Sequence, residues 1–328
     1  MNILITGGTG FIGSRLAIEC RQRGDRVKVL GQTHTDIEKE NQKIIESAGA
    51  IVVSGSMMDR ELIFEQTEGI DVVYHLAAAQ HESNIADQVF RDVNVEGTRN
   101  MLDACVYHKV RRMIHGSTIG VYGHLDGQID EQSVCHPDNI YGKTKLEGEK
   151  LVLSYRDKLP VTVIRISETY GPGDRRLLKL FKAIQNHMFF MIGSGKNLHH
   201  LIFIDDLVNG IIQSGQSDAA IGNVMILAGK NPITTDKMVQ TIADELKTKV
   251  PGFKAPLSMF MMVAVILEFL LKPLGISPPL HRRRMDFFRK SFVLSGSKAF
   301  DMMNFQPQYG FREGVAATAG WYRETGKL

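Results

Sequence analysis

The segment Asn2-Ile3-Leu4-Ile5-Thr6-Gly7-Gly8-Thr9-Gly10-Phe11-Ile12-Gly13 sets the architecture of the chain. Its first five residues form a short apolar run, which is typical of a buried strand. Glycines then recur at a spacing of three, and a helical pattern follows through Leu16 and Ile18. This is the strand, turn and helix of a dinucleotide site. Gly7 permits the tight turn, Gly10 lets the backbone approach a pyrophosphate, and Gly13 lets the helix pack closely against the strand.

Strand-like and helix-like segments alternate beyond this turn. We expect strands at 27–30, 50–53, 71–75, 112–115, 161–166 and 201–204, and helices at 85–106, 141–155 and 175–187. The alternation predicts an α/β fold, a Rossmann-type doubly wound parallel sheet with helices on both faces. We divide the chain into an NAD(P)-binding Rossmann domain, residues 1–170, and a smaller C-terminal lobe, residues 171–328. The lobe is mainly substrate-binding and partly interleaved with the sheet.

Composition argues against several classes of protein. The 328 residues carry a net charge of only +3, which gives no reason to expect a nucleic-acid partner. Cys20, Cys105 and Cys135 have neither disulfide nor metal-ligand spacing, and we predict no metal site. We expect a cytoplasmic protein, because no basic and apolar leader precedes the first strand and the cysteines suit a reducing compartment.

Residues 257–271 are almost wholly apolar, interrupted by Ser258 and Glu268. Fifteen residues are too few to span a bilayer comfortably. A core or substrate-lid helix is the favoured interpretation. The second is an interfacial helix that makes peripheral membrane contact and admits an apolar substrate. A membrane span is the least favoured.

Tyr141 and Lys145 lie four residues apart and therefore share one face of a helix. A phenol with an ordinary pKa near ~10 is a poor acid or base at neutral pH, and a neighbouring ammonium lowers that pKa. General acid–base catalysis at a carbinol or carbonyl needs such tuning. Ser117 and Thr118 end the strand upstream, where a hydroxyl can donate a hydrogen bond to the carbinol or carbonyl oxygen on which Tyr141 would act. The combination predicts an oxidoreductase-type site.

With these motifs, the chain resembles the extended short-chain dehydrogenases/reductases grouped as NAD-dependent epimerase/dehydratase proteins. The matching motifs keep the family's order over residues 1 to about 210: 6–13, 75–78, 94–98, 116–123, 141–145, Arg165 with 170–173, and 203–206. The C-terminal third carries Ser297-Lys298-Ala299 and Phe305-Gln306-Pro307 after the apolar segment. It is similar to the branch that holds 3-beta-hydroxysteroid dehydrogenase-like proteins.

The resemblance implies a role for each site residue. Tyr141 would be the catalytic acid/base, Lys145 would hold the nicotinamide ribose and tune Tyr141, and Thr118 would bind the substrate. The implied cofactor-binding residues are Gly7, Thr9, Gly10, Phe11, Ile12, Gln32, Ser56, Met57, Leu76, Ala77, Ala78, Asn94, Ser117, Tyr141, Lys145 and Ile166. The implied substrate-binding residues are Gln80, Thr118, Ile119, Tyr141, Glu168, Arg175 and His199.

The choice between NAD and NADP rests on the end of the second strand. NAD-specific members usually place an acid there and NADP-specific members a basic residue. This chain has Gly31-Gln32-Thr33-His34, which is neither pattern. We interpret Asp36 and Asp59 as helix caps. No arginine follows the strand to bind a 2′-phosphate, which favours NAD.

Two departures concern the substrate. Sugar-nucleotide members of the family typically have Asn and Arg, for holding a diphosphate, where this chain has Glu168 and His199. A carboxylate repels a diphosphate, and a histidine replaces a bidentate arginine poorly. Ile119 and Gly120 also stand where dehydratases and decarboxylases place acids, which argues against those reactions.

Three functions therefore compete. The first is an NAD(P)-dependent oxidoreductase for a secondary alcohol or ketone of a small molecule, sterol-like or lipid-like. The second is a UDP-sugar 4-epimerase, in which Arg175, Arg176 or 282–284 would replace the missing diphosphate contacts. The third is a non-catalytic cofactor-sensing module, disfavoured by the intact set of Thr118, Tyr141 and Lys145. The resemblance also implies a homodimer formed through the helices at 85–106 and 141–155.

Overall fold

The computed structural model describes residues 1–80, 86–125, 127–271 and 282–328. A seven-stranded parallel sheet lies at its centre, with the strand order β12-β7-β5-β4-β1-β2-β3. Its strands are β1 (Asn2–Thr6), β2 (Arg26–Gly31), β3 (Ile51–Ser54), β4 (Val72–His75), β5 (Arg112–Thr118), β7 (Val161–Ile166) and β12 (Val224–Leu227). This confirms the predicted α/β Rossmann-type fold.

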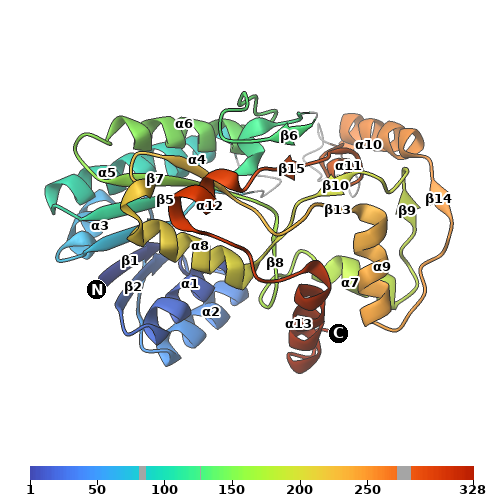
Figure 1. Cartoon of the computed structure of the whole chain (residues 1–328), viewed down its shortest axis with the longest axis horizontal. Helices are drawn as coiled ribbons and strands as arrows, with labels where there is room; N and C mark the ends of the chain where they lie inside the picture. The colour runs from blue at the N-terminus through green and yellow to red at the C-terminus, as the bar shows by residue number, and fades with distance from the viewer. Residues whose placement is uncertain (81–85, 126, 272–281) are drawn as a thin grey trace.

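Helices cover both faces of the sheet (Figure 1). One face carries α1 (Phe11–Gln22), α2 (Asp36–Ser47) and α8 (Ile204–Gln216), and the other carries α3 (Arg60–Thr67), α5 (Gly97–Tyr107) and α6 (Ile140–Ser154). Successive side chains of β1 alternate between these layers. Ile3 and Ile5 join the core beneath α1 and α8, whereas Leu4 joins the core beneath α5 and α6.

The remaining elements gather mostly at the carboxyl ends of the strands, on the right of Figure 1. Four two-stranded pairs are β6 (Gln128–Ile129) with β15 (Val293–Leu294), β8 (Thr169–Tyr170) with β11 (Ile202–Phe203), β9 (Met191–Ile192) with β14 (Lys254–Ala255), and β10 (Leu198–His199) with β13 (Ile233–Thr234). The helices here are α7 (Leu178–Gln185), α9 (Thr235–Glu245), α10 (Leu257–Leu271), α11 (Arg282–Arg289) and α13 (Phe311–Glu324). Helix α12 (Ser297–Met303) instead packs against β12 of the central sheet (Figure 1).

Several expected boundaries change in detail. The helix expected at 85–106 is α4 (Asp87–Arg91), a π-helical turn (Asp92–Glu96) and α5 in succession, and residue 85 lies outside the described residues. The helix expected at 175–187 is only α7, and the strand expected at 201–204 is only β11, because Ile204 already begins α8. Residues 257–271 form a helix with the expected bounds.

Strand β12 lies beyond residue 170 and yet completes the sheet, with Val224 paired to Val163 of β7. Residues of the C-terminal part therefore contribute to the sheet itself. The division at residue 170 stays a prediction. Within the described residues, no helix is long and apolar enough to cross a membrane.

Candidate active site

The glycine turn between β1 and α1 has the shape that the sequence predicts. Gly7 has a φ of +68°, and a Cβ at this position would lie 2.7 Å from the backbone nitrogen of Ala77. A Cβ at Gly13 would lie 2.4 Å from the Gly7 carbonyl oxygen. At Gly10 the added Cβ would meet only that same oxygen, at 3.2 Å, which leaves its outer side open. No side chain caps α1, so its first N–H groups remain for an anion.

Most of the other predicted cofactor residues lie at or just after the carboxyl ends of five further strands of the sheet. Gln32 comes after β2, Ser56 and Met57 after β3, and the alanine pair 77–78 after β4. Ser117 and Ile166 lie at the ends of β5 and β7, where Ile166 pairs with Thr118. The edge where β1 lies between β4 and β2 is the crevice in which doubly wound sheets bind nucleotides.

Individual residues of this group differ in exposure. Thr9 is buried, and its hydroxyl lies against Gly31 at the end of β2. Phe11, Ile12, Leu76 and Ala77 are half-buried along the crevice. These environments suit a cofactor that lies across the strand ends. A nicotinamide dinucleotide therefore fits the residues present.

Asn94 braces the loop that follows β4. It lies fully buried in the π-helical turn, where its Oδ1 accepts from the Ala79 N–H at 2.8 Å and its Nδ2 donates to Thr144 Oγ1 at 3.0 Å. Thr144 precedes Lys145 in α6. The amide side chain thus ties the loop after β4 to helix α6, which carries Tyr141 and Lys145.

Lys145 is buried beneath the end of β5. Its ammonium donates to the Gly116 carbonyl oxygen at 2.7 Å and lies 3.5 Å from His115 Nε2. Burial lowers the pKa of Lys145 to about 8, and the nearby Glu149 carboxylate opposes that shift. Tyr141 lies one turn earlier on the same helix and is half-buried. A cation one turn from the phenol is the arrangement that favours its ionisation.

Two buried histidines lie beside this ammonium. His75 bonds Thr6 Oγ1 through Nδ1 at 2.7 Å and Thr98 Oγ1 through Nε2 at 3.0 Å, and its ring centroid is 5.3 Å from that of His115. Burial, reinforced by the Lys145 charge, lowers the pKa of His75 to about 3 and that of His115 well below its usual value. Both rings are neutral at pH 7, so they add no positive charge to the site.

Thr118 is the last residue of β5 and carries the strand-end hydroxyl that the sequence singled out. Ser117 donates its own proton to Glu149 Oε1 at 2.5 Å. Thr118 Oγ1 accepts from the Gly120 N–H at 3.1 Å, which leaves its proton able to donate to a second oxygen. Ile119 follows at the start of a 3₁₀ turn (Ile119–Tyr122) and is buried.

Sequence reasoning missed the role of Glu149, which forms a buried ion pair with Arg165. The guanidinium Nη2 lies 2.8 Å from Glu149 Oε2, and Nη1 donates to the Tyr122 hydroxyl at 2.7 Å. Together with Ser117 this network joins α6 to β5 and β7. Glu149 lies four residues after Lys145, and that helical spacing was the available signal.

Glu168 and His199 form a pair just beyond the end of β7. Glu168 Oε2 lies 2.9 Å from His199 Nδ1. His199 is buried, and its Nε2 bonds Thr235 Oγ1 at 3.1 Å and Asn197 Nδ2 at 3.2 Å. The Glu168 side chain remains 39% exposed, so the pair presents a fixed carboxylate to its surroundings.

The arginines expected near a diphosphate have other partners. Arg175 forms an ion pair with Glu40 of α2. Arg176 contacts Asp174 Oδ1 through Nε at 3.1 Å and donates to the Thr169 carbonyl oxygen at 2.6 Å. The side chains of 282–284 lie outside the description, and Gln80 is exposed at the end of its loop. Among the described residues, Arg175 therefore makes no hydrogen bond or ion pair with Glu168 or His199 and instead contacts Glu40.

The two aspartates interpreted as caps differ in outcome. Asp59 caps α3 by accepting from the Leu62 N–H at 3.0 Å, which confirms the prediction. Asp36 is not the cap of α2, and this prediction is wrong. The helix begins at Asp36, so the residue before it, Thr35, is the N-cap. The Thr35 hydroxyl accepts from the Glu38 N–H, and the Glu38 carboxylate accepts from the Thr35 N–H in return.

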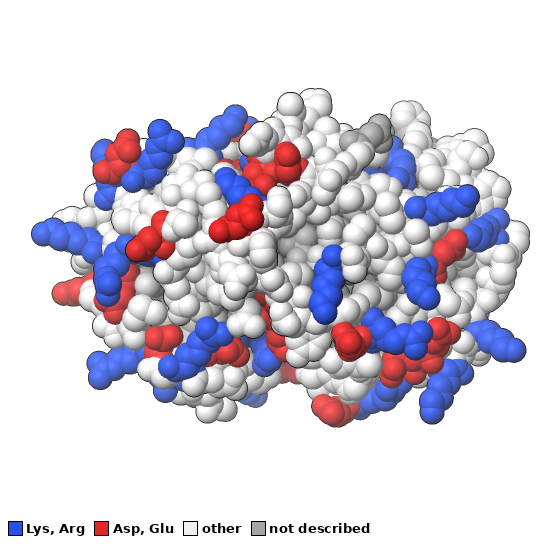
Figure 2. Space-filling view, in the orientation of Figure 1, with Lys and Arg blue, Asp and Glu red and all other residues white. Residues whose placement is uncertain are grey.

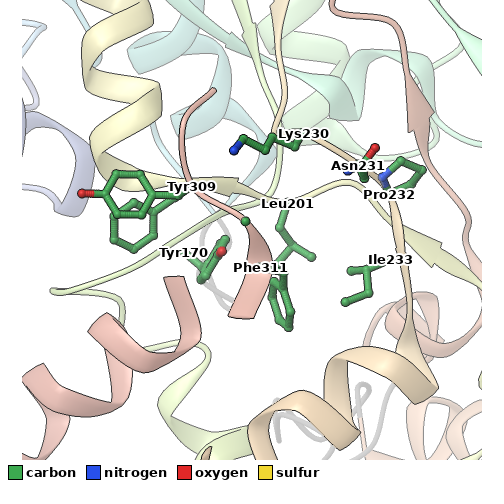
Figure 3. Close-up of a pocket in the computed structure, with 10 residues that line it drawn as sticks. Tyr170, Leu201, Lys230, Asn231, Pro232, Ile233, Tyr309 and Phe311 are labelled. Atoms are coloured by element: carbon green, nitrogen blue, oxygen red, sulfur yellow. The ribbon is translucent and has the colours of Figure 1, made fainter. Parts of the chain in front are cut away.

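A separate hollow of about 180 Å³ opens between β8, β11, the turn after β12 and the start of α13. Figure 3 shows residues from these separate segments around it: Tyr170, Leu201, Lys230, Asn231, Pro232, Ile233, Tyr309 and Phe311. None of the predicted site residues lines it. Among the described residues, no cluster of His, Cys, Asp or Glu could hold a metal ion.

A parallel sheet with a glycine turn, a buried lysine one turn from a tyrosine, and a strand-end hydroxyl together define a nicotinamide-dependent enzyme of the short-chain dehydrogenase/reductase type. The chain belongs to the NAD dependent epimerase/dehydratase family, whose model matches residues 3–228.

Two curated relatives show the range of this family. The 3beta-hydroxysteroid-dehydrogenase/decarboxylase isoform 2 of Arabidopsis thaliana is 28% identical over 96% of this chain, which spans only 61% of that protein's length. The N-acetyl-alpha-D-glucosaminyl-diphospho-ditrans,octacis-undecaprenol 4-epimerase of Escherichia coli O157:H7 is 27% identical over 84% of this chain and 81% of its own.

Among solved structures, a dTDP-glucose 4,6-dehydratase from Streptomyces venezuelae with NAD bound has a TM-score of 0.80 at 25% identity. The match covers 99% of this chain and 97% of that one. The family model thus covers residues 3–228, the fold likeness extends over 99% of the chain, and the relatives are named for different substrates.

Proposed function

We propose that the chain is an NAD-dependent oxidoreductase that acts on a secondary alcohol or ketone of an apolar, sterol-like or lipid-like molecule. When bound, NAD supplies the hydride acceptor or donor for this reaction. The choice of NAD over NADP is supported by the end of β2, where no arginine follows Gly31.

Three side chains would perform the proton chemistry. Tyr141 would exchange a proton with the reacting oxygen, and Thr118 would donate a hydrogen bond to the same oxygen. Lys145 would bind the cofactor ribose and keep the Tyr141 phenol ionisable through its nearby charge. The Gly116 carbonyl holds the Lys145 ammonium at 2.7 Å, which fixes its position under the strand end.

The observation that carries the substrate proposal is the Glu168–His199 pair. His199 Nδ1 holds the Glu168 carboxylate at 2.9 Å, at a position where diphosphate-binding members carry an amide. An oriented negative charge there disfavours a nucleoside diphosphate. The similarity to the Arabidopsis hydroxysteroid dehydrogenase over 96% of the chain supports an apolar alcohol.

Thermal-shift measurements with UDP, dTDP and GDP, each with saturating NAD, test the proposal. A ligand that binds only the folded state raises the unfolding midpoint. We expect NAD to raise it and the three nucleotides to add nothing. NADH formation from a panel of hydroxysteroids should then identify a substrate. A clear further rise of the unfolding midpoint with one nucleotide, together with inactivity on every apolar alcohol, would refute the proposal.

A UDP-sugar 4-epimerase is the second candidate. It is favoured by the Escherichia coli relative, which is named as a 4-epimerase of a diphospho-linked sugar. It predicts interconversion of UDP-sugars with no net change in NADH absorbance. The variant Glu168→Asn separates the two candidates, because it restores the amide of the epimerases. If the Glu168 charge excludes a diphosphate, this variant should bind UDP more tightly than the wild type does. If the chain is an epimerase, the wild type already binds UDP and the variant should change that affinity little.

A further inference from the structure

Helix α10 turns an apolar face to the outside of the molecule. Met262, Phe269 and Leu270 are 60%, 78% and 56% exposed, and the other exposed apolar residues of this face are Met259, Val263, Val265 and Ile266. The opposite face is buried through Ala264 and Glu268, so the carboxylate of α10 does not interrupt the exposed surface. Large apolar patches on a protein surface usually mark an interaction site.

Two phenylalanines outside the helix extend this surface. Phe190 and Phe253 are both exposed, and their ring centroids are 6.4 Å apart. Phe190 also lies 5.8 Å from the Phe260 ring of α10. We call α10 with Phe190 and Phe253 the apolar platform. Its members come from three separate segments, so the fold itself assembles it.

Positive charge is concentrated in the same part of the chain. Residues 171–328 contain 20 Lys and Arg against 12 Asp and Glu, whereas residues 1–170 contain 19 against 24. Residues 247–290, on either side of α10, contain nine against two. Lys249, Lys254 and Arg289 are exposed, and two of them also form surface ion pairs, Lys254 with Asp236 and Arg289 with Asp286. In Figure 2 the upper right, where Figure 1 places α10, is mostly white, and Lys and Arg lie beside and below it.

We propose that the apolar platform seats this protein on the surface of an anionic lipid bilayer. The apolar side chains would enter the boundary between headgroups and acyl chains, and the surrounding cations would contact the lipid phosphates and carboxylates. Fifteen residues of helix extend about 22 Å, which suits a helix lying in the plane of the membrane.

A second copy of the chain suits this platform less well. Two platforms placed face to face would bring the same cations against one another, and like charges oppose such an interface. An anionic bilayer instead complements both the apolar face and the charges around it. The proposal concerns only where the protein resides and is independent of the substrate.

Co-sedimentation of the full chain with vesicles tests the proposal. We expect binding to phosphatidylcholine vesicles that contain phosphatidylserine, weaker binding to phosphatidylcholine alone, and loss of binding as salt rises. The double variant Met262→Asn, Phe269→Asn should lower the partition coefficient at least about tenfold. Ile51→Asn is the matched control, since Ile51 is 63% exposed on β3 and far from α10 in the fold.

Two kinds of result would overturn the proposal, one from vesicle binding and one from the oligomeric state. One is equal vesicle binding by the wild type and the double variant, or no binding by either. The other is a dimer in sedimentation velocity that the double variant dissociates, because a second copy would then cover the platform. Near-UV circular dichroism and the thermal shift by NAD, both unchanged from the wild type, would establish that the double variant is folded.

Discussion

Lys145 is a fully buried ammonium, and its protonation should leave a signature in the stability of the protein. Burial lowers its pKa to about 8 from 10.5, so between these pH values the unfolded chain holds more protons than the folded one. The free energy of unfolding therefore rises with pH between about 8 and 10.5, by at most about 3 kcal/mol from this group. Below pH 8 the buried ammonium destabilises the folded state by that full amount.

Replacing this side chain by an apolar one should therefore not destabilise the protein at neutral pH. We predict that Lys145→Met without cofactor unfolds in urea at or above the wild-type midpoint at pH 7, because Glu149 keeps Arg165 as its partner. NAD affinity should fall about tenfold, the value of one charge-assisted hydrogen bond. Lys143→Met, exposed on the same helix, should change neither quantity.

Tyr141 should be separable from cofactor binding. We predict that Tyr141→Phe lowers turnover at least about 100-fold on the substrate found by the panel, because the reacting oxygen loses its proton partner. NAD affinity, measured by calorimetry, should stay within about twofold, since removing a phenolic oxygen leaves the buried Lys145 in place. Tyr155→Phe removes a hydroxyl bonded to Asp103 and should not change turnover.

At the scale of elements, the π-helical turn at Asp92–Glu96 positions one side chain between two loops. We predict that Asn94→Ala lowers the free energy of unfolding by about 1–3 kcal/mol, because the Ala79 N–H and the Thr144 hydroxyl lose a buried partner. Urea unfolding measures this change. Asn100→Ala removes a half-buried bond to the Met57 carbonyl and should cost less.

Most strands could be predicted because each contains a short apolar stretch between turn signals, and the glycine turn because its spacing is dictated by backbone contacts. The π-helical turn could not, since its sequence keeps the helical period on both sides. Strand β12 was missed because four apolar residues, 224–227, do not distinguish a strand from a buried helix segment.

In the candidate site, too, local relations could be predicted from the sequence and long-range contacts could not. That Lys145 and Tyr141 lie one turn apart could be predicted from their spacing, because α6 enforces it. The contact between Arg175 and Glu40 joins residues 135 positions apart, and no local pattern encodes it. The pairing of Glu168 with His199 likewise depends on how β10 returns beside the end of β7, although both residues had been singled out.

For the whole molecule, a homodimer through α4, α5 and α6 remains the expectation from the family resemblance. Val89 of α4 is exposed beside α6, where Arg91 and Glu147 join the two helices at 2.6 Å. We predict a dimer at micromolar concentration by light scattering, and a monomer for Val89→Arg, which places a charge in the interface. A wild-type monomer would refute it, and Ile51→Arg on β3 controls for added charge.

The residues proposed for proton transfer and the Glu168–His199 pair belong to different parts of this fold. Thr118 and Lys145 are anchored in β5 and α6, whereas Glu168 and His199 lie outside the central sheet, at the ends of short segments. After gene duplication, a descendant could therefore exchange two side chains and acquire a new metabolite while inheriting the hydride chemistry intact. A laboratory library confined to positions 168 and 199 would explore the same route.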